Sequence, residues 1–346
     1  MASEPSFAHA PGRWWDKWAS AHSFVATAEG VRIHYVDVGP RDALPIVLVH
    51  GWPDMWFGWR HQIEALSPKY RLIVPDMRGF GQSSAPRELE AYGGKNVTGD
   101  FAALLDALDI EKAVFIGHDW GGAMVWRMCL YHPHRVLAVG GVCTPYTPPH
   151  DKYIDIDLVV KLVPQFAYQK VLADADNTGK IFDSAPKRFF TAMFRRNREF
   201  AKDVKPLGVV AMINGLQNKV EHPMYSKRSV LLSEDELSYY VEQYSRNGFH
   251  TTCHYYGTRK IDFENEKNLP KILPHKTLFI AAANDSVLRP EMAKKMPTVI
   301  PNLQMKLVKD AGHWVLWEQK EQVNALLEEW LQTIEKPINN KRHAKL

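Results

Sequence analysis

One short segment, residues 117–122, combines an acidic side chain with the glycines that a tight turn requires. Its sequence is Gly-His-Asp-Trp-Gly-Gly, and it lies between the apolar run 113–116 and a stretch with helical spacing. A strand, a sharp turn and a helix form the context in which a nucleophile is held out from a sheet. An aspartate can also merely cap a helix, but capping does not require glycines on both sides. We therefore predict that Asp119 is a nucleophile, which attacks saturated carbon and becomes an ester.

A histidine and a second aspartate follow two later strand-like runs. Asp285 lies just past the apolar run 277–280, and His313 follows the run 303–308. The chain contains 15 histidines, so position rather than residue type singles out His313. The order nucleophile, acid, histidine is that of a known catalytic arrangement. We predict that His313 activates water for hydrolysis of the Asp119 ester. Asp285 is then the partner that fixes the histidine tautomer, although an aspartate there could also cap a turn.

Two backbone N–H groups are candidates for an oxyanion hole. One belongs to Trp120, which directly follows the nucleophile. The other belongs to Trp52, in the His-Gly-Trp-Pro segment that begins at His50 and follows the apolar run 46–49. Gly51 permits unusual backbone angles, and a cis bond between Trp52 and the following proline is possible. His118, beside the nucleophile, is expected to be a structural neighbour of the turn.

The positions of the apolar runs predict a mostly parallel, doubly wound sheet with an inserted helical lid. The alternating run 31–36 is typical of a half-buried edge strand. Strand-like runs alternate with helical spacing, as at 100–108, which favours an α/β fold. Between about 147 and 260 the pattern is helical, with an explicit capping box from Ser233 to Glu236. We expect core segments at 1–146 and 261–338, a lid at 147–260, a final helix at about 318–334 and a tail at 339–346.

The motifs together resemble the soluble epoxide hydrolases, in the aspartate-nucleophile branch of the α/β-hydrolase fold. The resemblance rests on the segments at 50–53, 78–83, 117–122 and 312–314 and extends over about residues 24–334. It implies conversion of an epoxide and water to a vicinal diol, with a role in detoxification. The resemblance also implies two lid tyrosines that donate to the epoxide oxygen.

The resemblance carries these tyrosine roles to Tyr168 and Tyr256. Tyr168 lies in a Phe-Ala-Tyr-Gln motif, and Tyr256 follows His-Tyr. The second match is imperfect, because His254 stands where the family more often has Asn and Gly257 where it often has Arg. Tyr255 therefore remains an alternative for the second acid.

Aromatic residues suggest an apolar pocket for a small epoxide. We expect three residues at its wall: His50, Phe166 and Trp314. The expected chemistry uses water and the side chains already named, so we expect no cofactor. The three cysteines are not at metal-ligand spacing, so we expect no metal either.

Other functions remain open on the same residues. A haloalkane or haloacetate dehalogenase shares the turn at residues 117–122, but Trp52 stands where a halide-binding Asn is common. An ester hydrolase is a further alternative on this scaffold. A non-catalytic binding protein on this scaffold usually lacks the nucleophile, the acid or the histidine, whereas Asp119, Asp285 and His313 are all present here.

Composition narrows the partners and the location. The formal net charge is +4 over 346 residues, scattered rather than in the stripe that nucleic-acid binding requires. No window is apolar over the length of a membrane span, and the first residues do not resemble a secretory signal. Three cysteines, an odd number, are typical of reduced residues in an intracellular protein. We expect a cytoplasmic or peroxisomal protein that is not secreted.

The final tripeptide, Ala344-Lys345-Leu346, resembles the Ser-Lys-Leu peroxisomal address. It predicts a peroxisomal import receptor as a partner. The sequence gives no indication of the oligomeric state.

Overall fold

The computed structural model describes residues 13–196, 199 and 207–343. A sheet of eight strands lies at its centre, in the order β1-β2-β4-β3-β5-β6-β7-β8. The strands are β1 (His22–Ala26), β2 (Arg32–Val38), β3 (Pro45–Val49), β4 (Arg71–Pro75), β5 (Ala113–His118), β6 (Val136–Val142), β7 (Lys276–Ala282) and β8 (Leu303–Val308). The β1–β2 and β2–β4 pairs are antiparallel, and the other pairs are parallel. The predicted mostly parallel sheet is confirmed.

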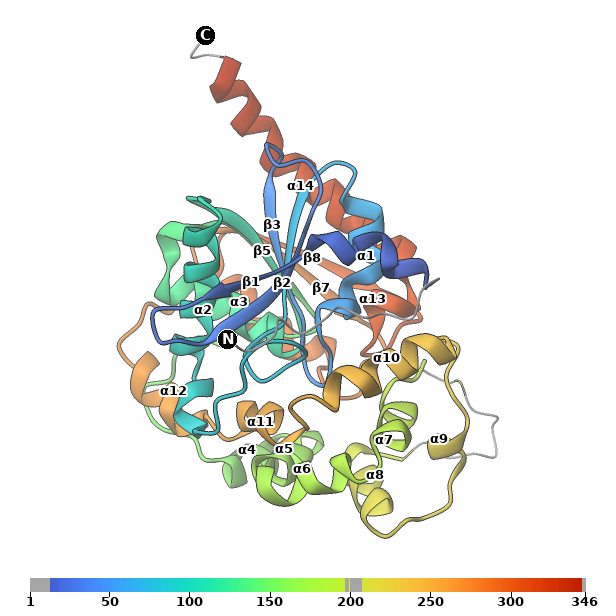
Figure 1. Ribbon diagram of the computed structural model, residues 1–346. Helices are drawn as coiled ribbons and strands as arrows, with labels where there is room; N and C mark the ends of the chain where they lie inside the picture. The colour runs from blue at the N-terminus through green and yellow to red at the C-terminus, as the bar shows by residue number, and fades with distance from the viewer. Residues whose placement is uncertain (1–12, 197–198, 200–206, 344–346) are drawn as a thin grey trace.

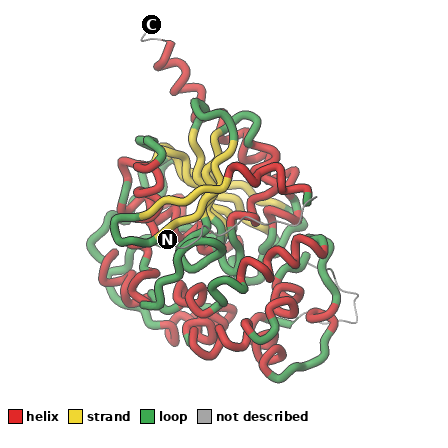
Figure 2. The backbone as a smooth tube through the Cα atoms, in the orientation of Figure 1, coloured by secondary structure: helices red, strands yellow, loops and turns green. Residues whose placement is uncertain are grey.

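Helices cover both faces of this sheet (Figure 2). The core helices are η1 (Trp14–Ala21), η2 (Trp56–Trp59), α1 (Arg60–Leu66), η3 (Leu89–Tyr92), α2 (Gly94–Ala107), α3 (Trp120–Tyr131), η4 (Pro133–Arg135), η7 (Pro290–Thr298), α13 (Val315–Glu318) and α14 (Lys320–His343). Strand β5 is buried along its whole length, and β3 is buried beyond its first residue. Their continuous apolar runs are therefore explained, because a parallel strand with helices on both faces has no solvent side.

Strand β2 differs from the expectation of a half-buried edge strand. A preceding strand, β1, pairs with it and takes the edge position. Five of the seven residues of β2 are buried as a result. The sequence of β1, His-Ser-Phe-Val-Ala, is too short and too polar to stand out as a strand before its pairing partner is known.

A helical segment separates β6 from β7, and the structure describes no strand in it. Its helices are α4 (Ile156–Leu162), η5 (Pro164–Phe166), α5 (Ala167–Ala173), α6 (Ala175–Asp183), α7 (Pro186–Met193), α8 (Val209–Gln217), α9 (Pro223–Ser226), α10 (Glu234–Tyr244), α11 (His250–Cys253), η6 (His254–Tyr256) and α12 (Arg259–Glu266). They gather at one side of the sheet, at the bottom of Figure 1, opposite the end of α14. The capping box at the start of α10 is formed as predicted: the Ser233 side chain accepts from the Glu236 N–H, and the Glu236 carboxylate accepts from the Ser233 N–H.

The last helix is longer than the sequence indicated. Helix α14 continues to His343, past the expected end near residue 334 and through the expected start of the tail at 339. Pro337 therefore lies within this helix rather than after its end. None of the helices in the described ranges is both long enough and apolar enough to cross a membrane. The tripeptide at 344–346 lies outside the described residues.

Candidate active site

Asp119 lies at the turn between β5 and α3, in a strained backbone conformation. Its φ is +51° and its ψ is −121°, values that a residue with a side chain rarely adopts. The turn is tight because a Cβ on Gly117 would lie 2.2 Å from the carbonyl oxygen of Gly121. The hydroxyl of Thr144, which comes just after β6, donates to the Asp119 carbonyl at 2.6 Å. Neighbouring elements thus hold the Asp119 backbone in a geometry that its own sequence disfavours.

Two backbone N–H groups hydrogen-bond the Asp119 carboxylate. The Trp52 N–H donates to Oδ1 of Asp119 at 2.8 Å, and the Trp120 N–H also hydrogen-bonds the carboxylate. The two groups predicted as an oxyanion hole therefore both point toward the Asp119 carboxylate. The bond between Trp52 and Pro53 is cis. Gly51 allows this approach, since a Cβ there would lie 2.4 Å from the Cβ of Asp119.

His313 lies between the two aspartates that the sequence singled out. Its Nδ1 is 2.8 Å from Oδ2 of Asp285, and its Nε2 is 3.6 Å from Oδ2 of Asp119. The other oxygen of Asp285 accepts the N–H groups of Val287 and Leu288, both at 2.9 Å. Backbone hydrogen bonds therefore hold the Asp285 carboxylate in position to accept the Nδ1–H of His313.

Charge and burial shift the titration of all three groups. Burial raises the pKa of Asp119, against the opposing charge of His313 and two backbone N–H groups. Burial alone would lower the pKa of His313, but Asp285 and then Asp119 raise it to about 9. Burial alone would also raise the pKa of Asp285, yet His313 and the backbone donors lower it to about 2. At neutral pH the His313 imidazole is therefore protonated.

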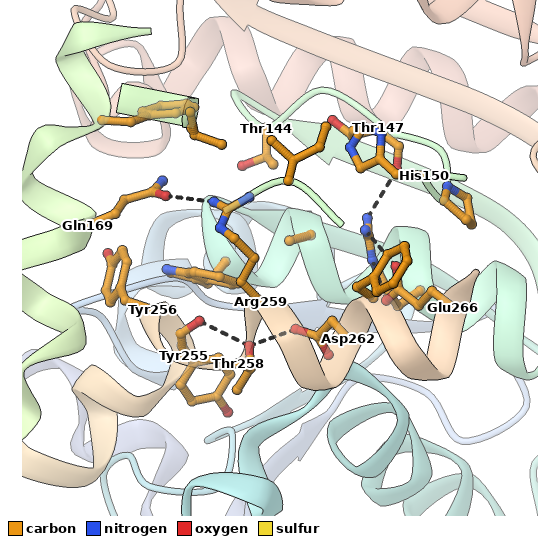
Figure 3. A pocket seen from close by; sticks show the side chains of 18 of the residues that line it. Thr144, Thr147, His150, Gln169, Tyr255, Tyr256, Thr258, Arg259, Asp262 and Glu266 are labelled. Atoms are coloured by element: carbon orange, nitrogen blue, oxygen red, sulfur yellow. Dashed lines mark hydrogen bonds and ion pairs between the residues drawn. The ribbon is translucent and has the colours of Figure 1, made fainter. Parts of the chain in front are cut away.

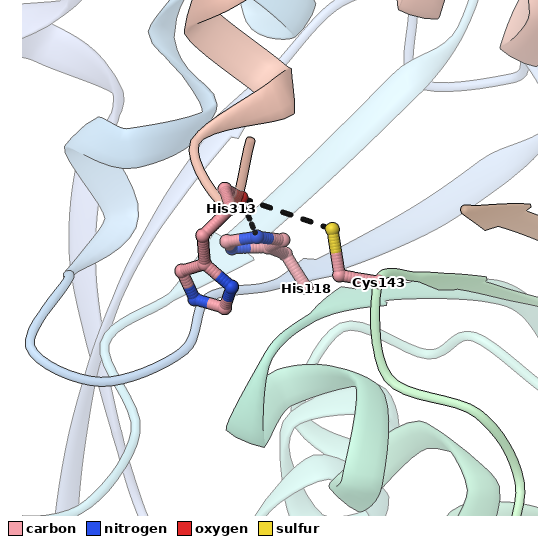
Figure 4. A group of neighbouring side chains, drawn as sticks. All are labelled: His118, Cys143 and His313. Carbon is pink, nitrogen blue, oxygen red and sulfur yellow. Dashed lines mark hydrogen bonds between the residues drawn. The ribbon is translucent and has the colours of Figure 1, made fainter. Parts of the chain in front are cut away.

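His118 and Cys143 approach the main chain of His313 (Figure 4). The His118 Nε2 lies 2.8 Å from the carbonyl oxygen of His313, and the Cys143 sulfur lies 3.8 Å from the same atom. Burial lowers the pKa of His118 to about 3, so its ring is neutral and can donate one N–H. Burial raises the pKa of the Cys143 thiol well above its usual value. Metals bind thiolates, so the protonated Cys143 thiol and the neutral His118 ring are better suited to fixing the His313 backbone.

Tyr168 and Tyr256 lie together near the Asp119 carboxylate. Tyr168 comes from α5 and Tyr256 from η6, and their ring centroids are 5.8 Å apart. The Tyr256 ring stands perpendicular to both Trp52 and Trp120, at centroid distances of 5.5 and 5.2 Å. Burial, reinforced by the Asp119 charge, raises the pKa of both phenols, so both stay protonated at neutral pH.

Tyr255, the alternative second acid, has a different partner. Its hydroxyl donates to the carbonyl oxygen of Arg78 at 3.0 Å, in a position that is 1% exposed. Neighbouring residues of a 3₁₀ turn such as η6 point in directions about 120° apart. The turn therefore sends the hydroxyl of Tyr255 into the core and leaves Tyr256 beside Tyr168.

The three expected pocket residues occupy different places. Phe166 lines a cavity beside Tyr256 (Figure 3). His50 is fully buried behind the loop that carries Trp52. Its Nε2 accepts the Met77 N–H at 3.0 Å, and its Nδ1 faces the Gly51 carbonyl. Trp314 is 5% exposed and donates its indole N–H to the Met193 carbonyl. Neither His50 nor Trp314 lines that cavity.

Sequence reasoning missed several contacts that shape this site. Thr144 supports the elbow, Thr252 accepts the indole N–H of Trp52 at 3.2 Å, and the hydroxyl of Tyr240 donates to Asp54 at 2.7 Å. A single threonine or tyrosine gives no recognisable signal in a sequence. Asp54 could have been noticed, because it directly follows the oxyanion motif.

Comparison with known proteins agrees with this architecture. A family model described as the alpha/beta hydrolase fold matches residues 45–320, and a model described as epoxide hydrolase N terminus matches residues 14–59. The first match defines the fold class. Epoxide hydrolase A of Mycobacterium tuberculosis is 31% identical over 88% of this chain and 96% of that protein. The chain belongs to the epoxide hydrolase family.

Further relatives extend this comparison. Bifunctional epoxide hydrolase 2 of Mus musculus is 36% identical over 90% of this chain but only 56% of its own length. The chain therefore spans little more than half of that relative. A crystal structure of epoxide hydrolase A from Mycobacterium thermoresistibile superimposes with a TM-score of 0.78 at 31% identity, covering 90% of this chain and 98% of that one.

Proposed function

We propose that this protein hydrolyses epoxides to vicinal diols through a covalent ester on Asp119. One observation carries the proposal: the Trp52 N–H binds Oδ1 of the Asp119 carboxylate, and Oδ2 faces His313 at 3.6 Å. A carboxylate at an elbow attacks saturated carbon rather than a carbonyl. The family relationship makes a strained three-membered ether the natural target.

The first chemical step is ring opening by Asp119. Its Oδ1 is held by the Trp52 N–H, so Oδ2 is the oxygen free to attack an epoxide carbon. As the carbon–oxygen bond breaks, Tyr168 and Tyr256 donate hydrogen bonds to the departing oxygen, and one proton transfers to it. Their raised pKa values keep both hydroxyls protonated until that moment. The product is a hydroxyalkyl ester of Asp119.

The second step is hydrolysis of that ester. Esterification removes the negative charge of Asp119, which is one of the causes that raise the pKa of His313. The His313 imidazolium can then return a proton through solvent to the tyrosinate that ring opening left. The neutral ring acts as the base toward water, while Asp285 holds it. Hydroxide attacks the ester carbonyl carbon, and the N–H groups of Trp52 and Trp120 stabilise the resulting oxyanion. The tetrahedral intermediate then collapses: the bond between the Asp119 carbonyl carbon and the alkyl oxygen breaks, and that oxygen takes a proton from His313 and leaves in the diol. The carboxylic acid formed on Asp119 returns its proton to His313, which restores the starting charges.

A single-turnover experiment in ¹⁸O-labelled water tests the covalent step. With enzyme in excess over styrene oxide, the label should enter the Asp119 carboxylate and stay out of the first diol formed. Intact-protein mass spectrometry of the His313→Gln variant should show an adduct with the mass of the epoxide, located on Asp119. Label that appears directly in the first diol, together with no adduct, would contradict the mechanism.

The tyrosine roles need a separate test with a matched control. Tyr168→Phe and Tyr256→Phe together should abolish ring opening, because general acids typically contribute about 10²- to 10⁴-fold each. Tyr255→Phe is the control, since its hydroxyl contacts the Arg78 carbonyl. Rapid-quench measurement of alkylation distinguishes the variants. Alkylation at the wild-type rate in the double variant would refute the assignment.

We further propose that residues 147–260 act as a lid on a core formed by residues 1–146 and 261–338. Buried contacts across the boundary support this division. The Arg60 side chain pairs with Glu236 of α10 at 2.9 Å, and the hydroxyl of Tyr240 donates to Asp54. Limited proteolysis should cut first near the boundaries of the proposed lid, and cleavage confined to the core would contradict this division.

The final tripeptide carries a proposal about location. We propose that residues 344–346 direct import into peroxisomes through a receptor that reads Ala-Lys-Leu. A fluorescent protein fused to the N-terminus should report peroxisomal puncta, and deletion of the three residues should make the signal diffuse. Identical distributions of the two fusions would argue against an address.

A further inference from the structure

Strand β8 forms one edge of the sheet, and its outer residues include two exposed apolar side chains. The strand pairs with β7 on one side and is the last strand in the order of the sheet. Met305 and Leu307 are 43% and 50% exposed, and they share a face because strand side chains alternate between faces. The opposite edge differs, since no large apolar side chain is exposed along β1, all of which the structure describes. An exposed apolar edge strand is a surface on which another strand can pair.

The main chain of β8 also presents hydrogen-bonding groups to the outside. The carbonyl oxygen of Asn302, just before β8, accepts the Thr277 N–H of β7 at 2.9 Å. The carbonyl oxygen of Val308 accepts the Ala283 N–H at 2.9 Å, so the even-numbered residues face β7. The N–H and C=O groups of successive strand residues point to alternate sides. The odd-numbered residues of β8 therefore direct their backbone donors and acceptors away from the sheet.

The sequence of β8 is complementary to itself when two copies run in opposite directions. With a two-fold axis between the two copies of Met305, each Leu303 lies opposite Leu307 of the partner subunit. All of these opposed side chains are apolar, and apolar cross-strand pairs stabilise a sheet. Gln304 lies opposite Lys306 of the partner subunit, so a charge meets a neutral amide. In this register the outward backbone groups of the odd-numbered residues face one another as hydrogen-bonded pairs.

Lys306 is the one charged residue of β8, and it favours this register over the neighbouring one. Its side chain lies on the face opposite Met305 and pairs with Glu329 of α14 at 3.4 Å. A two-fold axis at Lys306 would put two lysines directly opposite each other, which destabilises a sheet. An axis at Met305 avoids this contact. A lysine can also protect an edge strand from pairing, but the ion pair with Glu329 holds this one toward α14.

We propose that this protein forms a dimer in which the β8 strands of two copies pair antiparallel, with the two-fold axis at Met305. The two eight-stranded sheets then continue into one another. Both copies use the same surface, as is usual in dimers with two-fold symmetry. Pairing removes Met305 and Leu307 from water and satisfies the outward backbone groups of β8. The interface is separate from the proposed reaction at Asp119, so its test needs no substrate.

Sedimentation velocity across a series of protein concentrations tests whether the dimer forms. Wild-type protein should sediment as a dimer, and Met305→Lys should raise the dissociation constant at least about tenfold, because it opposes two like charges at the axis. Val230→Lys is the matched control: it adds the same charge at an apolar position that is 75% exposed and lies outside β8. This control should sediment as wild type does. Circular dichroism and urea unfolding check that both variants fold as wild type does.

Introduced cysteines test the register itself. The Cα atoms of a hydrogen-bonded antiparallel pair lie about 5.5 Å apart, which is within the range that a disulfide spans. Met305→Cys should therefore form a covalent dimer under mild oxidation. Leu303→Cys and Leu307→Cys should each form none alone, because each lies roughly 13 Å along the strands from its own copy. The two should link when they are co-expressed in separate chains. The native cysteines are buried and do not compete.

Three results would overturn the proposal. The first is a wild-type protein that stays monomeric at every concentration, which would leave β8 to another kind of partner or to solvent. The second is a wild-type dimer that Met305→Lys does not weaken, which would place the contact elsewhere on the molecule. The third is a disulfide that forms through Lys306→Cys but not through Met305→Cys, because that would shift the axis by one residue.

Discussion

Asp54 should make the stability of this protein depend on pH in an unusual direction. The side chain is 1% exposed, and its oxygen accepts from the hydroxyl of Tyr240 at 2.7 Å and from the Met55 N–H at 2.8 Å. Burial raises its pKa from 3.8 to about 7, despite these hydrogen bonds and the charge of Arg60. The folded state therefore holds a proton that the unfolded state releases near pH 3.8.

The sign and size of the effect follow from this pKa. For an acid whose folded pKa is raised, stability falls as pH rises from the unfolded toward the folded value. Each pKa unit corresponds to about 1.4 kcal/mol, so ionised Asp54 costs about 4 kcal/mol once the pH exceeds 7. Asp54→Asn keeps the shape and the acceptor oxygen but cannot ionise. The free energy of unfolding of this variant, relative to wild type, should therefore rise by about 3 kcal/mol between pH 4.5 and pH 8.

Urea denaturation at a series of pH values measures this difference directly. Taking the variant relative to wild type cancels the contributions of other groups that titrate in the same range. Asp42→Asn, at an exposed turn position, is the control and should give a difference that does not change with pH. If the Asp54→Asn difference is flat between pH 4.5 and 8, Asp54 is ionised throughout in the folded protein and the argument from burial is wrong.

Further predictions concern the catalytic residues themselves. Gly51→Ala should lower kcat/KM by about 100-fold or more, because the added Cβ would lie 2.4 Å from the Cβ of Asp119. Gly99→Ala is the control: a Cβ at that position would meet no atom within 4 Å and should not alter the rate. Equal rates for the two variants would show that the loop moves freely. Asp285→Asn should slow ester hydrolysis by up to roughly 10⁴-fold, so that rapid quench detects accumulated ester; slowing of alkylation alone would exclude this role. His313, with its pKa raised from 6.5 to about 9, contributes stability that is complete below pH 6.5 and lost as pH rises through 9, about 3 kcal/mol at most. Its side chain is 22% exposed, which reduces this figure. His313→Gln should flatten the unfolding free energy between pH 6.5 and 9, and an unchanged slope would contradict the shift.

Local sequence rules were sufficient to find the turn at Asp119 and the strand ends that Asp285 and His313 follow. The glycines around Asp119 follow from the close approach of β5 to α3. Asp285 and His313 were each indicated by their position just past the end of a strand. Patterns of this kind extend over only a few residues, so they can be recognised before the fold is known. The same is true of the capping box at Ser233, in which the two partners lie three positions apart.

The choice between Tyr255 and Tyr256 shows where such rules stop. The two residues are adjacent and chemically identical, so no local pattern separates their roles. The turn of η6 separates them, because it directs the Tyr255 hydroxyl to the Arg78 carbonyl, 177 positions away in the chain. Strand β1 was missed for a related reason, since a short strand is defined mainly by the partner with which it pairs.

The amino-acid sequence alone predicted the fold class, the tight turn that carries Asp119 and the pairing of His313 with Asp285. These features depend on backbone geometry that a few neighbouring residues impose. The packed fold was needed to show which tyrosine lies beside Tyr168 near Asp119 and why Asp54 is buried. Each of these depends on contacts between residues far apart in the chain, and burial and charge pairing at such contacts are properties of the packed molecule rather than of any segment.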